Sequence, residues 1–276
     1  MATRSKRRTP RPLCLTDHPD EVVLEILRRL DIRDAVCTSA LSHAWRHHWR
    51  HLPVLDFRDC SFGRLGVASA AQSVLRRHLA LVDAFALDAR SPPLPEADHP
   101  RLDDLLVHLS SPRHPLEALV LKLSSHKLHS SIFSHVKLKY LDLKGCLLPN
   151  FTPGFSGLCN LKGLYVHYTA KLKHHLNSAQ FDMLAALISG CPGLEELAVK
   201  VVPEVAGVTL KIAAPRLRHL EIKACSTGWM VGFVSLLPDL ACAKLQLPFS
   251  AMLRKGGVKA SAYFPGHFAR GGAGVA

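Results

Sequence analysis

The 276-residue sequence has no stretch approaching the roughly 18 consecutive apolar residues that a membrane-spanning helix needs. Its first residues, MATRSKRRTPRP, contain no apolar segment of the kind found in a secretory signal. None of the eight cysteines forms a Cys-x-x-Cys pair, which indicates reduced thiols rather than a disulfide framework. These absences predict a protein of the nucleus or cytoplasm with no membrane partner.

Motifs of catalysis are also missing. The sequence contains no Walker-type phosphate loop, no Gly-x-Ser-x-Gly and no His-Glu-x-x-His. His43, His47 and His51 recur every four residues, a spacing that metal ligands could use, but no cysteine or carboxylate completes the set on that helix face. We therefore expect no catalytic residues, no metal, no cofactor and no enzymatic activity.

Acidic residues are scarce, 22 against 35 lysines and arginines, and the net charge is +13. The excess concentrates at the ends, since residues 1–12 carry five basic residues and 249–276 carry four, with no acidic residue in either. We expect a basic, disordered head at 1–12 and a disordered tail rich in Gly and Ala at 249–276, interpreted as a truncated end. Nucleic-acid binding through these ends is a weaker alternative, because the centre of the chain is nearly balanced.

The stretch from Leu15 to Trp49 is predicted to form three short helices. Five apolar residues lie on one face of the first helix, and they are Val22, Val23, Ile26, Leu27 and Leu30. Asp31 to Asp34 breaks the pattern, and Ser42 is the expected cap of a third helix that carries Trp45 and Trp49 on one side. Three helices of this size bury too little surface to be stable alone, so the stretch is interpreted as a docking module.

This stretch resembles the F-box of plant F-box proteins. The matching residues are Pro19, Asp20, Glu21, Val22, Ile26, Leu27, Leu30, Arg33 to Val36, Thr38 to Ser42, Trp45 and Trp49. Three positions depart from the family pattern, with His18 in place of Leu, Asp31 in place of Pro and Ala44 in place of Arg.

A repeat follows from residue 116 onward, with the pattern Leu-x-x-Leu-x-(Leu/Val/Ile). Its copies are Leu116/Leu119/Leu121, Leu138/Leu141/Leu143, Leu161/Leu164/Val166, Leu194/Leu197/Val199, Leu217/Leu220/Ile222 and a weaker Cys242/Leu245/Leu247. Residues 51–57 are expected to lead into a first short strand, and 85–87 to form another, with helices at 66–81, 101–109 and 178–189, the last with Ser178 as its cap. A strand and a return segment per repeat predict a parallel, single-sheet solenoid.

The repeat segments also resemble those of plant F-box/leucine-rich-repeat proteins. The expected fold is an α+β or α/β solenoid, in which a three-helix F-box at 13–53 precedes a short, irregular leucine-rich-repeat arc at 54–248. Because side chains alternate along a strand, the residues between the leucines should face the concave side of the sheet. The expected substrate-binding residues there are Lys122, Lys144, Tyr165, His167, Lys200, Glu221 and Lys223, and the lysines among them should form a column that attracts an acidic or phosphorylated segment. The alternative is that these lysines only keep an exposed sheet soluble.

The resemblance implies a substrate-recognition subunit of a Skp–cullin–F-box ubiquitin ligase. The F-box would bind a Skp-type adaptor and, through it, a cullin, while the repeats bind a protein substrate. Expected adaptor contacts are Pro19, Asp20, Glu21, Val22, Ile26, Leu27, Leu30, Leu41, Trp45 and Trp49. An interaction scaffold that works without the adaptor, with an F-box weakened by His18 and Ala44, is the main alternative.

Overall fold

The structure is a computed structural model that describes residues 19–246, apart from 42, 44, 59–61, 63–65, 112, 152–154, 156, 204–207, 225–228 and 234–236. Several sequence predictions fall outside these residues, namely the head at 1–12, the tail at 249–276, His18, Ser42, Ala44 and Leu247. Within the described part, no helix is long and apolar enough to span a membrane.

The N-terminal region contains two α-helices, α1 (Asp20–Leu27) and α2 (Ile32–Cys37), followed by the 3-10 helices η2 (Thr38–Ala40) and η3 (His48–His51). The predicted third α-helix is wrong for the described residues between 43 and 51. They form turns and η3, with backbone bonds from Arg46 N–H to His43 O and from Arg50 N–H to His47 O, which close tighter i to i+3 turns. Asp31, one of the three departures from the family pattern, caps α2 by accepting a hydrogen bond of 2.8 Å from the Asp34 N–H.

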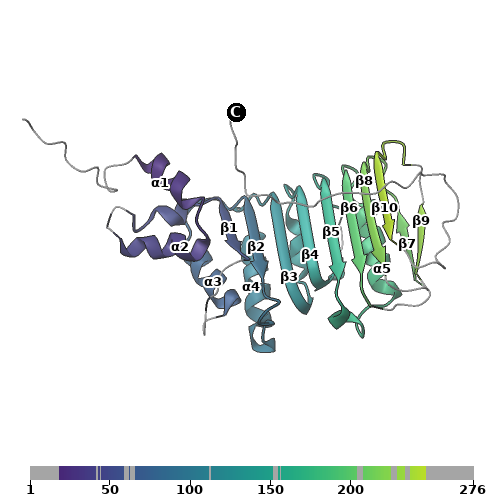
Figure 1. Ribbon diagram of the computed structural model, residues 1–276, viewed down its shortest axis with the longest axis horizontal. Coiled ribbons are helices and arrows are strands. Elements are labelled where there is room, and N and C mark those ends of the chain that lie inside the picture. Colours follow the sequence, from purple (N-terminus) through teal and green to yellow (C-terminus); the bar gives the residue numbers. More distant parts are fainter. Residues whose placement is uncertain are drawn as a thin grey trace, which may run out of the picture.

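The centre of the molecule is an eight-stranded, parallel sheet with the order β1-β2-β3-β4-β5-β6-β8-β10. Its strands lie side by side along the long axis, with α1 and α2 at the β1 end (Figure 1). The strands are β1 (Val54–Phe57), β2 (Ala84–Asp88), β3 (Ala118–Lys127), β4 (Tyr140–Leu147), β5 (Gly163–Tyr168), β6 (Glu196–Val201), β8 (His219–Ala224) and β10 (Cys242–Gln246).

The strand register reproduces five of the six predicted repeat copies. The second leucines of these copies lie opposite one another on successive strands, and they are Leu119, Leu141, Leu164, Leu197 and Leu220. The sixth copy was placed two residues too late, because Ala243 lies opposite Leu220 and Leu245 lies opposite Ile222. A shift of two residues keeps every side chain on its face of the sheet, so alternation alone does not detect it.

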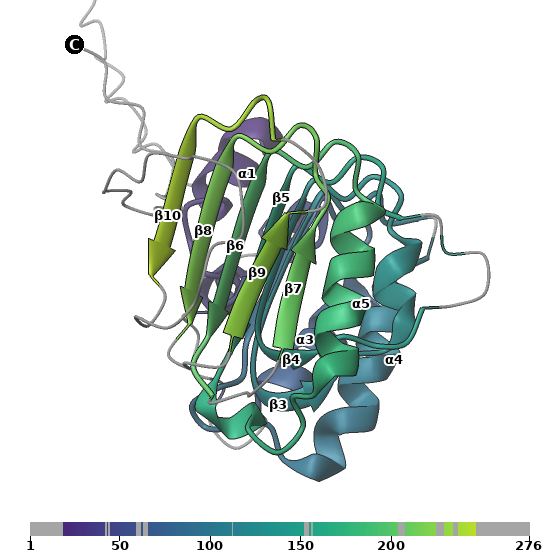
Figure 2. The same cartoon turned by 90° about the vertical axis from the view of Figure 1, so that its right-hand side faces the viewer.

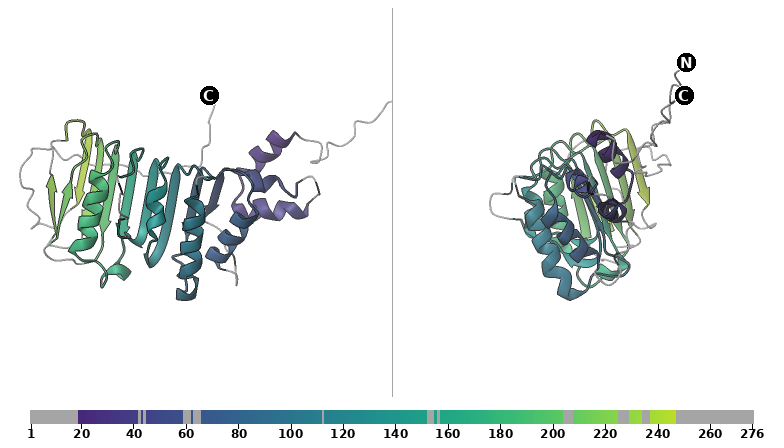
Figure 3. Two further views of the ribbon diagram at one scale, coloured as in Figure 1. Left: turned by 180° about the vertical axis from the view of Figure 1, so that it is seen from behind. Right: turned by 90° about the vertical axis from the view of Figure 1, so that its left-hand side faces the viewer.

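Among the described residues, the α-helices cover one face of this sheet. They are α3 (Val67–Arg77), α4 (His99–Leu109) and α5 (Ser178–Ser189), and the chain also forms the short 3-10 helices η5 (Glu96–Asp98), η6 (Ser130–Ser134) and η7 (Ala170–Leu172). Figures 2 and 3 show the three α-helices on the same side, with the opposite face of the sheet uncovered by them. We call that uncovered side the open face.

Two features of the helical side differ from the sequence prediction. The cap of α5 is Asn177, whose side chain accepts a hydrogen bond of 3.1 Å from Gln180 N–H, and Ser178 is instead the first helical residue. A second sheet of two parallel strands, β7 (Val208–Ile212) and β9 (Trp229–Phe233), was not predicted. It lies beside α5, which contacts β7 (Figure 2).

The core is continuous from the N-terminal helices into the sheet. Val23, Leu27, Trp45 and Trp49 belong to the same cluster of buried apolar residues as Leu55 of β1, and the cluster extends to the last strand. Consequently α1 and α2 are packed on the end of the sheet rather than tethered to it by a bare linker.

Candidate interaction surfaces

The first surface is an apolar stripe on the N-terminal helices. Val22, Ile26 and Leu30 recur every four residues and are exposed by 42, 37 and 40%, and Leu41 is exposed by 68%. Pro19, Asp20 and Glu21 are exposed at the start of the same helix. These seven expected adaptor contacts are therefore available to a partner. Apolar side chains that recur at helical spacing on a surface are typical of a protein interface.

The other three expected adaptor contacts lie in the interior. Leu27 is fully buried, and Trp45 and Trp49 are each 4% exposed. The sequence placed Leu27 in one stripe with Ile26, but Val23 and Leu27 turn inward while Val22 and Ile26 turn outward. In the structure as it stands, Leu27, Trp45 and Trp49 are not accessible to an adaptor, and they hold the surface residues in place.

A polar contact joins α1 to η3, because the imidazole Nε2 of His48 lies 3.0 Å from Asp20 Oδ1. Within η3, the guanidinium of Arg50 lies 5.7 Å from the centre of the Trp49 ring. Backbone N–H groups of Val22 and Val23 donate to Pro19 O at 3.0 and 3.2 Å, so the proline forms the start of the helix. The exposed stripe is thus presented by a helix whose first turn is held in place.

The second surface is the middle of the open face. The register places Lys122, Lys144, His167, Lys200 and Lys223 opposite one another on consecutive strands, in the row predicted from the sequence. All five are half-buried. Adjacent strands are about 4.8 Å apart, so neighbouring residues of this row lie closer together than the roughly 10 Å screening length of a dilute salt solution.

The cations in this row act on one another. Burial, followed by Arg90, Lys122 and Lys200, lowers the pKa of Lys144. Burial, followed by Lys144, Lys200 and Arg90, lowers the pKa of His167 to about 4, so its imidazole is neutral at pH 7. The fold therefore holds like charges together at a cost, which is a feature of functional sites more than of purely structural surfaces.

Carboxylates on the open face offset part of this charge, and sequence reasoning did not include most of them. Asp88 lies opposite Lys122 at the β2 end of the row and forms an ion pair with Arg90, with Nη2 at 2.5 Å from Oδ2. Burial alone would raise the pKa of Asp88, but the hydrogen bonds and charge of Arg90 lower it. Asp56 and Arg58 form a similar pair on β1 at 2.6 Å. The Asp-x-Arg pattern at the ends of two consecutive strands is the sequence feature from which both ion pairs could have been predicted.

Asp142 lies in the neighbouring row, between Val120 and Tyr165. Burial raises its pKa even though Lys122, Lys144, Arg58 and Arg90 oppose the rise. Glu221, another expected substrate contact, lies in the same row near Lys244 of β10, with Nζ at 3.9 Å from Oε1. Acidic groups thus border the lysines on the β2 and β8 sides.

Two tyrosines lie beside the cations. A Cβ atom at Gly163 would lie 2.8 Å from Cδ1 of Tyr140 and 3.0 Å from Cε2 of Tyr165, so both rings cover this glycine. The Tyr165 hydroxyl donates a hydrogen bond to the carboxylate of Glu196, and Tyr140 is 37% exposed. We call Tyr140 and Tyr165 the tyrosine platform. Tyr140 was not among the predicted site residues, although it occupies the position before Leu141 in its repeat.

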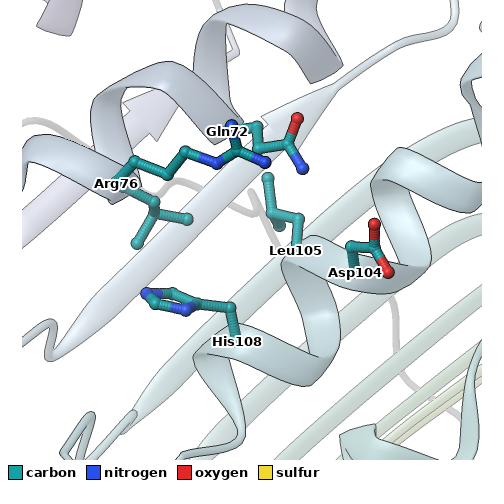
Figure 4. A pocket seen from close by; sticks show the side chains of 6 residues that line it. Gln72, Arg76, Asp104, Leu105 and His108 are labelled. Atoms are coloured by element: carbon teal, nitrogen blue, oxygen red, sulfur yellow. The ribbon is translucent and has the colours of Figure 1, made fainter.

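A pocket of about 250 Å³ lies on the opposite side, between α3 and α4. Figure 4 shows its lining, which consists of Gln72, Leu75, Arg76, Asp104, Leu105 and His108. One cation and one carboxylate balance each other around two leucines, so the lining favours no charge class of ligand. Over the described part of the chain, no group of three or more His, Cys, Asp or Glu side chains could hold a metal ion.

Comparison with known proteins agrees with the first of these surfaces. Residues 15–57 match the F-box domain family. An F-box/FBD/LRR-repeat protein of Arabidopsis thaliana is 30% identical over 223 residues, which is 76% of this chain and 49% of that protein. The chain belongs to the plant F-box/leucine-rich-repeat family.

Other relatives have similar descriptions. A putative FBD-associated F-box protein of Arabidopsis thaliana is 26% identical over 83% of this chain and 52% of its own length. An F-box/LRR-repeat protein of the same plant is 26% identical over 84% of this chain and 74% of its own length. This F-box protein spans about half the length of the first relatives it matches.

Proposed function

We propose that this F-box protein is the substrate-recognition subunit of a Skp–cullin–F-box ubiquitin ligase. The observation that carries the proposal is the exposed stripe of Val22, Ile26 and Leu30, together with the exposed Leu41, within the matched F-box. A few side chains that become buried on binding carry most of the energy of a protein interface, and no element of the described chain covers this stripe. Its partner is a Skp-type adaptor, which connects the chain to a cullin.

The remainder of the proposal concerns the sheet and the domain arrangement. Residues 13–53 form the F-box and 54–248 form a leucine-rich-repeat arc, supported by the shared register of its strands. The open face binds a protein substrate, and the chain itself catalyses no reaction. Holding a substrate near a ubiquitin-charged enzyme raises the effective concentration of the substrate's lysines, which is sufficient to speed ubiquitin transfer. The protein works in the nucleus or the cytoplasm.

The test is affinity purification of the tagged, full-length chain from plant cells, followed by mass spectrometry scored for Skp-type adaptors and cullins. The decisive variant is Ile26→Asp combined with Leu30→Asp, which places charge on the exposed stripe and leaves the buried residues unchanged. Leu79→Asp combined with Leu81→Asp is the matched control, because these leucines are 65 and 57% exposed in the segment between α3 and β2. We expect the adaptor with wild type and control and a loss of at least about tenfold with the stripe variant. Equal recovery with both variants would refute the assigned docking surface.

Adaptor-independent scaffolding remains a second candidate because His18 and Ala44 depart from the family pattern. In that case neither adaptor nor cullin is recovered with the wild-type chain, and His18→Leu restores both. Recovery with the wild-type chain rejects this candidate.

A further inference from the structure

The centre of the open face combines two kinds of side chain that recognise different groups. Lys144, His167 and Lys200 lie on the consecutive strands β4, β5 and β6, with the imidazole between the two ammonium groups. On the same face, Tyr140 lies four residues before Lys144 on β4, and Tyr165 lies two residues before His167 on β5. A charged subsite and an aromatic subsite therefore adjoin on the same pair of strands.

We propose that this centre binds an extended protein segment bearing a phosphorylated serine or threonine, with its phosphoryl group between Lys144, His167 and Lys200 and a proline or aromatic residue on the tyrosine platform. The inference rests on the proposed function, since it specifies the class of substrate that the open face recognises. It goes beyond a general attraction for acidic segments, because it assigns two subsites and the spacing between them.

The charge pattern favours a single, compact dianion. A phosphoryl group carries about −1.5 to −2 charges and three acceptor oxygens, which suits two flanking ammonium groups and an imidazole N–H. Asp88, the carboxylate of the same row, lies opposite Lys122 and forms its ion pair with Arg90. Bringing a dianion between Lys144 and Lys200 replaces mutual repulsion with attraction.

The surroundings disfavour a nucleic acid as the occupant. Asp142, Glu196 and Glu221 lie on β4, β6 and β8 on the same face, close to the cations. A nucleic-acid backbone carries a charge at every nucleotide, so an extended strand would meet these carboxylates as well as the lysines. A peptide with one phosphoryl group places its charge between Lys144 and Lys200 and brings no further phosphate beside these carboxylates.

The spacing between the phosphoryl subsite and the tyrosine platform follows from strand geometry. Tyr165 and His167 are two residues apart on β5 and face the same side, which separates them by about 6.6 Å along the strand. An extended peptide that runs along β5 has the same period, so its residues on one face are also two positions apart. The residue on the platform should therefore lie two positions from the phosphorylated residue. The Glu196 carboxylate holds the Tyr165 hydroxyl and so fixes this ring of the platform.

The experiment uses the immobilised full-length chain and a degenerate synthetic peptide library with a fixed central phosphoserine. Bound peptides are sequenced and compared with those from libraries with a central serine and a central glutamate. We expect retention of the phosphoserine library, with enrichment of proline and aromatic residues two positions from the phosphoserine on one side. Equal retention of the serine or glutamate library overturns the phosphoryl subsite, and enrichment spread evenly over all positions overturns the platform.

Variants provide the matched control. Lys144→Gln with Lys200→Gln should reduce retention of the phosphoserine library about tenfold, whereas Lys173→Gln with Lys211→Gln, which removes two exposed lysines elsewhere, should not. Because the first pair of changes relieves repulsion, its melting temperature should not fall. Lys144→Glu with Lys200→Glu should instead retain a library with a fixed central lysine. Equal losses in both glutamine variants, or stronger competition by single-stranded RNA than by the phosphopeptides, overturns the proposal.

These outcomes are separate from those of the adaptor experiment. The lysine variants leave the F-box stripe unchanged, so adaptor recovery should persist when peptide retention is lost. Failure of peptide selection with adaptor recovery intact rejects this inference alone, and failure of adaptor recovery rejects the proposed function.

Discussion

At the scale of single residues, neighbours in α1 have opposite roles. Ile26 is exposed and Leu27 is fully buried, although they are adjacent in an apolar stripe. The same division separates Leu41, at 68% exposure, from Trp45, at 4%. A large buried tryptophan contributes to folding, whereas an exposed leucine contributes little unless a partner covers it.

The difference predicts the stability of two F-box variants. Trp45→Ala should lower the free energy of unfolding by roughly 3 to 5 kcal/mol, because it leaves a large cavity in the core. Leu41→Ala should change it by less than about 0.5 kcal/mol. Urea titration followed by circular dichroism measures both. Similar midpoints for the two variants would show that Trp45 is not a core residue, and it would then return to the list of direct adaptor contacts.

A second prediction concerns the pH dependence of the free energy of unfolding. His135 is 5% exposed, and burial, followed by the charge of His114, lowers its pKa to about 4. An unfolded histidine titrates near 6.5, so between pH 6.5 and 4 the unfolded chain takes up a proton that the folded chain does not. Stability from this group is therefore present above pH 6.5 and is lost as pH falls, by about 3 kcal/mol at most.

The variant His135→Leu tests this effect. The loss in free energy of unfolding between pH 7 and pH 4.5 should be smaller in the variant than in wild type by about 2 kcal/mol. His174→Leu, at an exposed position, is the control and should follow the wild-type curve. An unchanged pH dependence in His135→Leu would contradict the assignment. His167, with its pKa at about 4, adds a loss of the same sign in all three proteins.

At the scale of elements, the backbone requires glycine at Gly145 of β4. Its φ is 68°, and a Cβ atom there would lie 2.0 Å from the carbonyl oxygen of Leu123, next to the place where the register of β3 shifts. Gly66, the residue before α3, has a similar φ of 70°, but the nearest atom to its Cβ would be 3.9 Å away. A comparison of alanine substitutions at Gly66 and Gly145 therefore distinguishes the cost of backbone strain from the cost of a steric clash.

Alanine substitutions at both glycines should therefore differ. Gly66→Ala should cost roughly 1 to 2 kcal/mol for its backbone conformation alone, with φ 70° and ψ 154°, which residues other than glycine rarely adopt. Gly145→Ala should cost roughly 3 kcal/mol, because the strands must also separate. Melting temperatures measured by differential scanning fluorimetry would show the order. A smaller decrease for Gly145→Ala than for Gly66→Ala would contradict the close approach of β3 and β4.

The start of α5 provides another matched pair. Asn177→Ala should lower the free energy of unfolding by about 1 kcal/mol, because its side chain satisfies the Gln180 N–H. Ser178→Ala should have little effect or be slightly stabilising, since alanine favours helix interiors. Thermal unfolding of both variants decides which residue is the cap, and the reverse order of stability would restore Ser178 to that role.

Most of the sheet was predictable from the sequence, because the spacing of Leu119, Leu141, Leu164 and their equivalents fixes both face and register. The strand β7 was missed although Val208, Leu210 and Ile212 alternate and are buried, because it interrupts the spacing of the repeat. The lysine row was predictable for the same reason as the leucines. The approach of the Tyr140 and Tyr165 rings to Gly163 depends on ring rotamers that no pattern encodes.

At the scale of the whole molecule, two candidate surfaces lie on one continuous core. The exposed stripe of α1 lies at the β1 end of the sheet, and the cations and tyrosine platform lie in its middle (Figure 1). The shared core keeps the F-box and the sheet in a fixed relation. A substrate on the open face would therefore be held at a defined position relative to an adaptor, which is what a substrate receptor requires.

The central claim is that the F-box of this chain binds a Skp-type adaptor. Size-exclusion chromatography with multi-angle light scattering, applied to the purified full-length chain mixed with a purified plant adaptor, tests it most directly. We predict a single species with the mass of one chain and one adaptor, which is absent when Ile26→Asp and Leu30→Asp are combined. Separate elution of the wild-type chain and the adaptor at their individual masses would contradict the account.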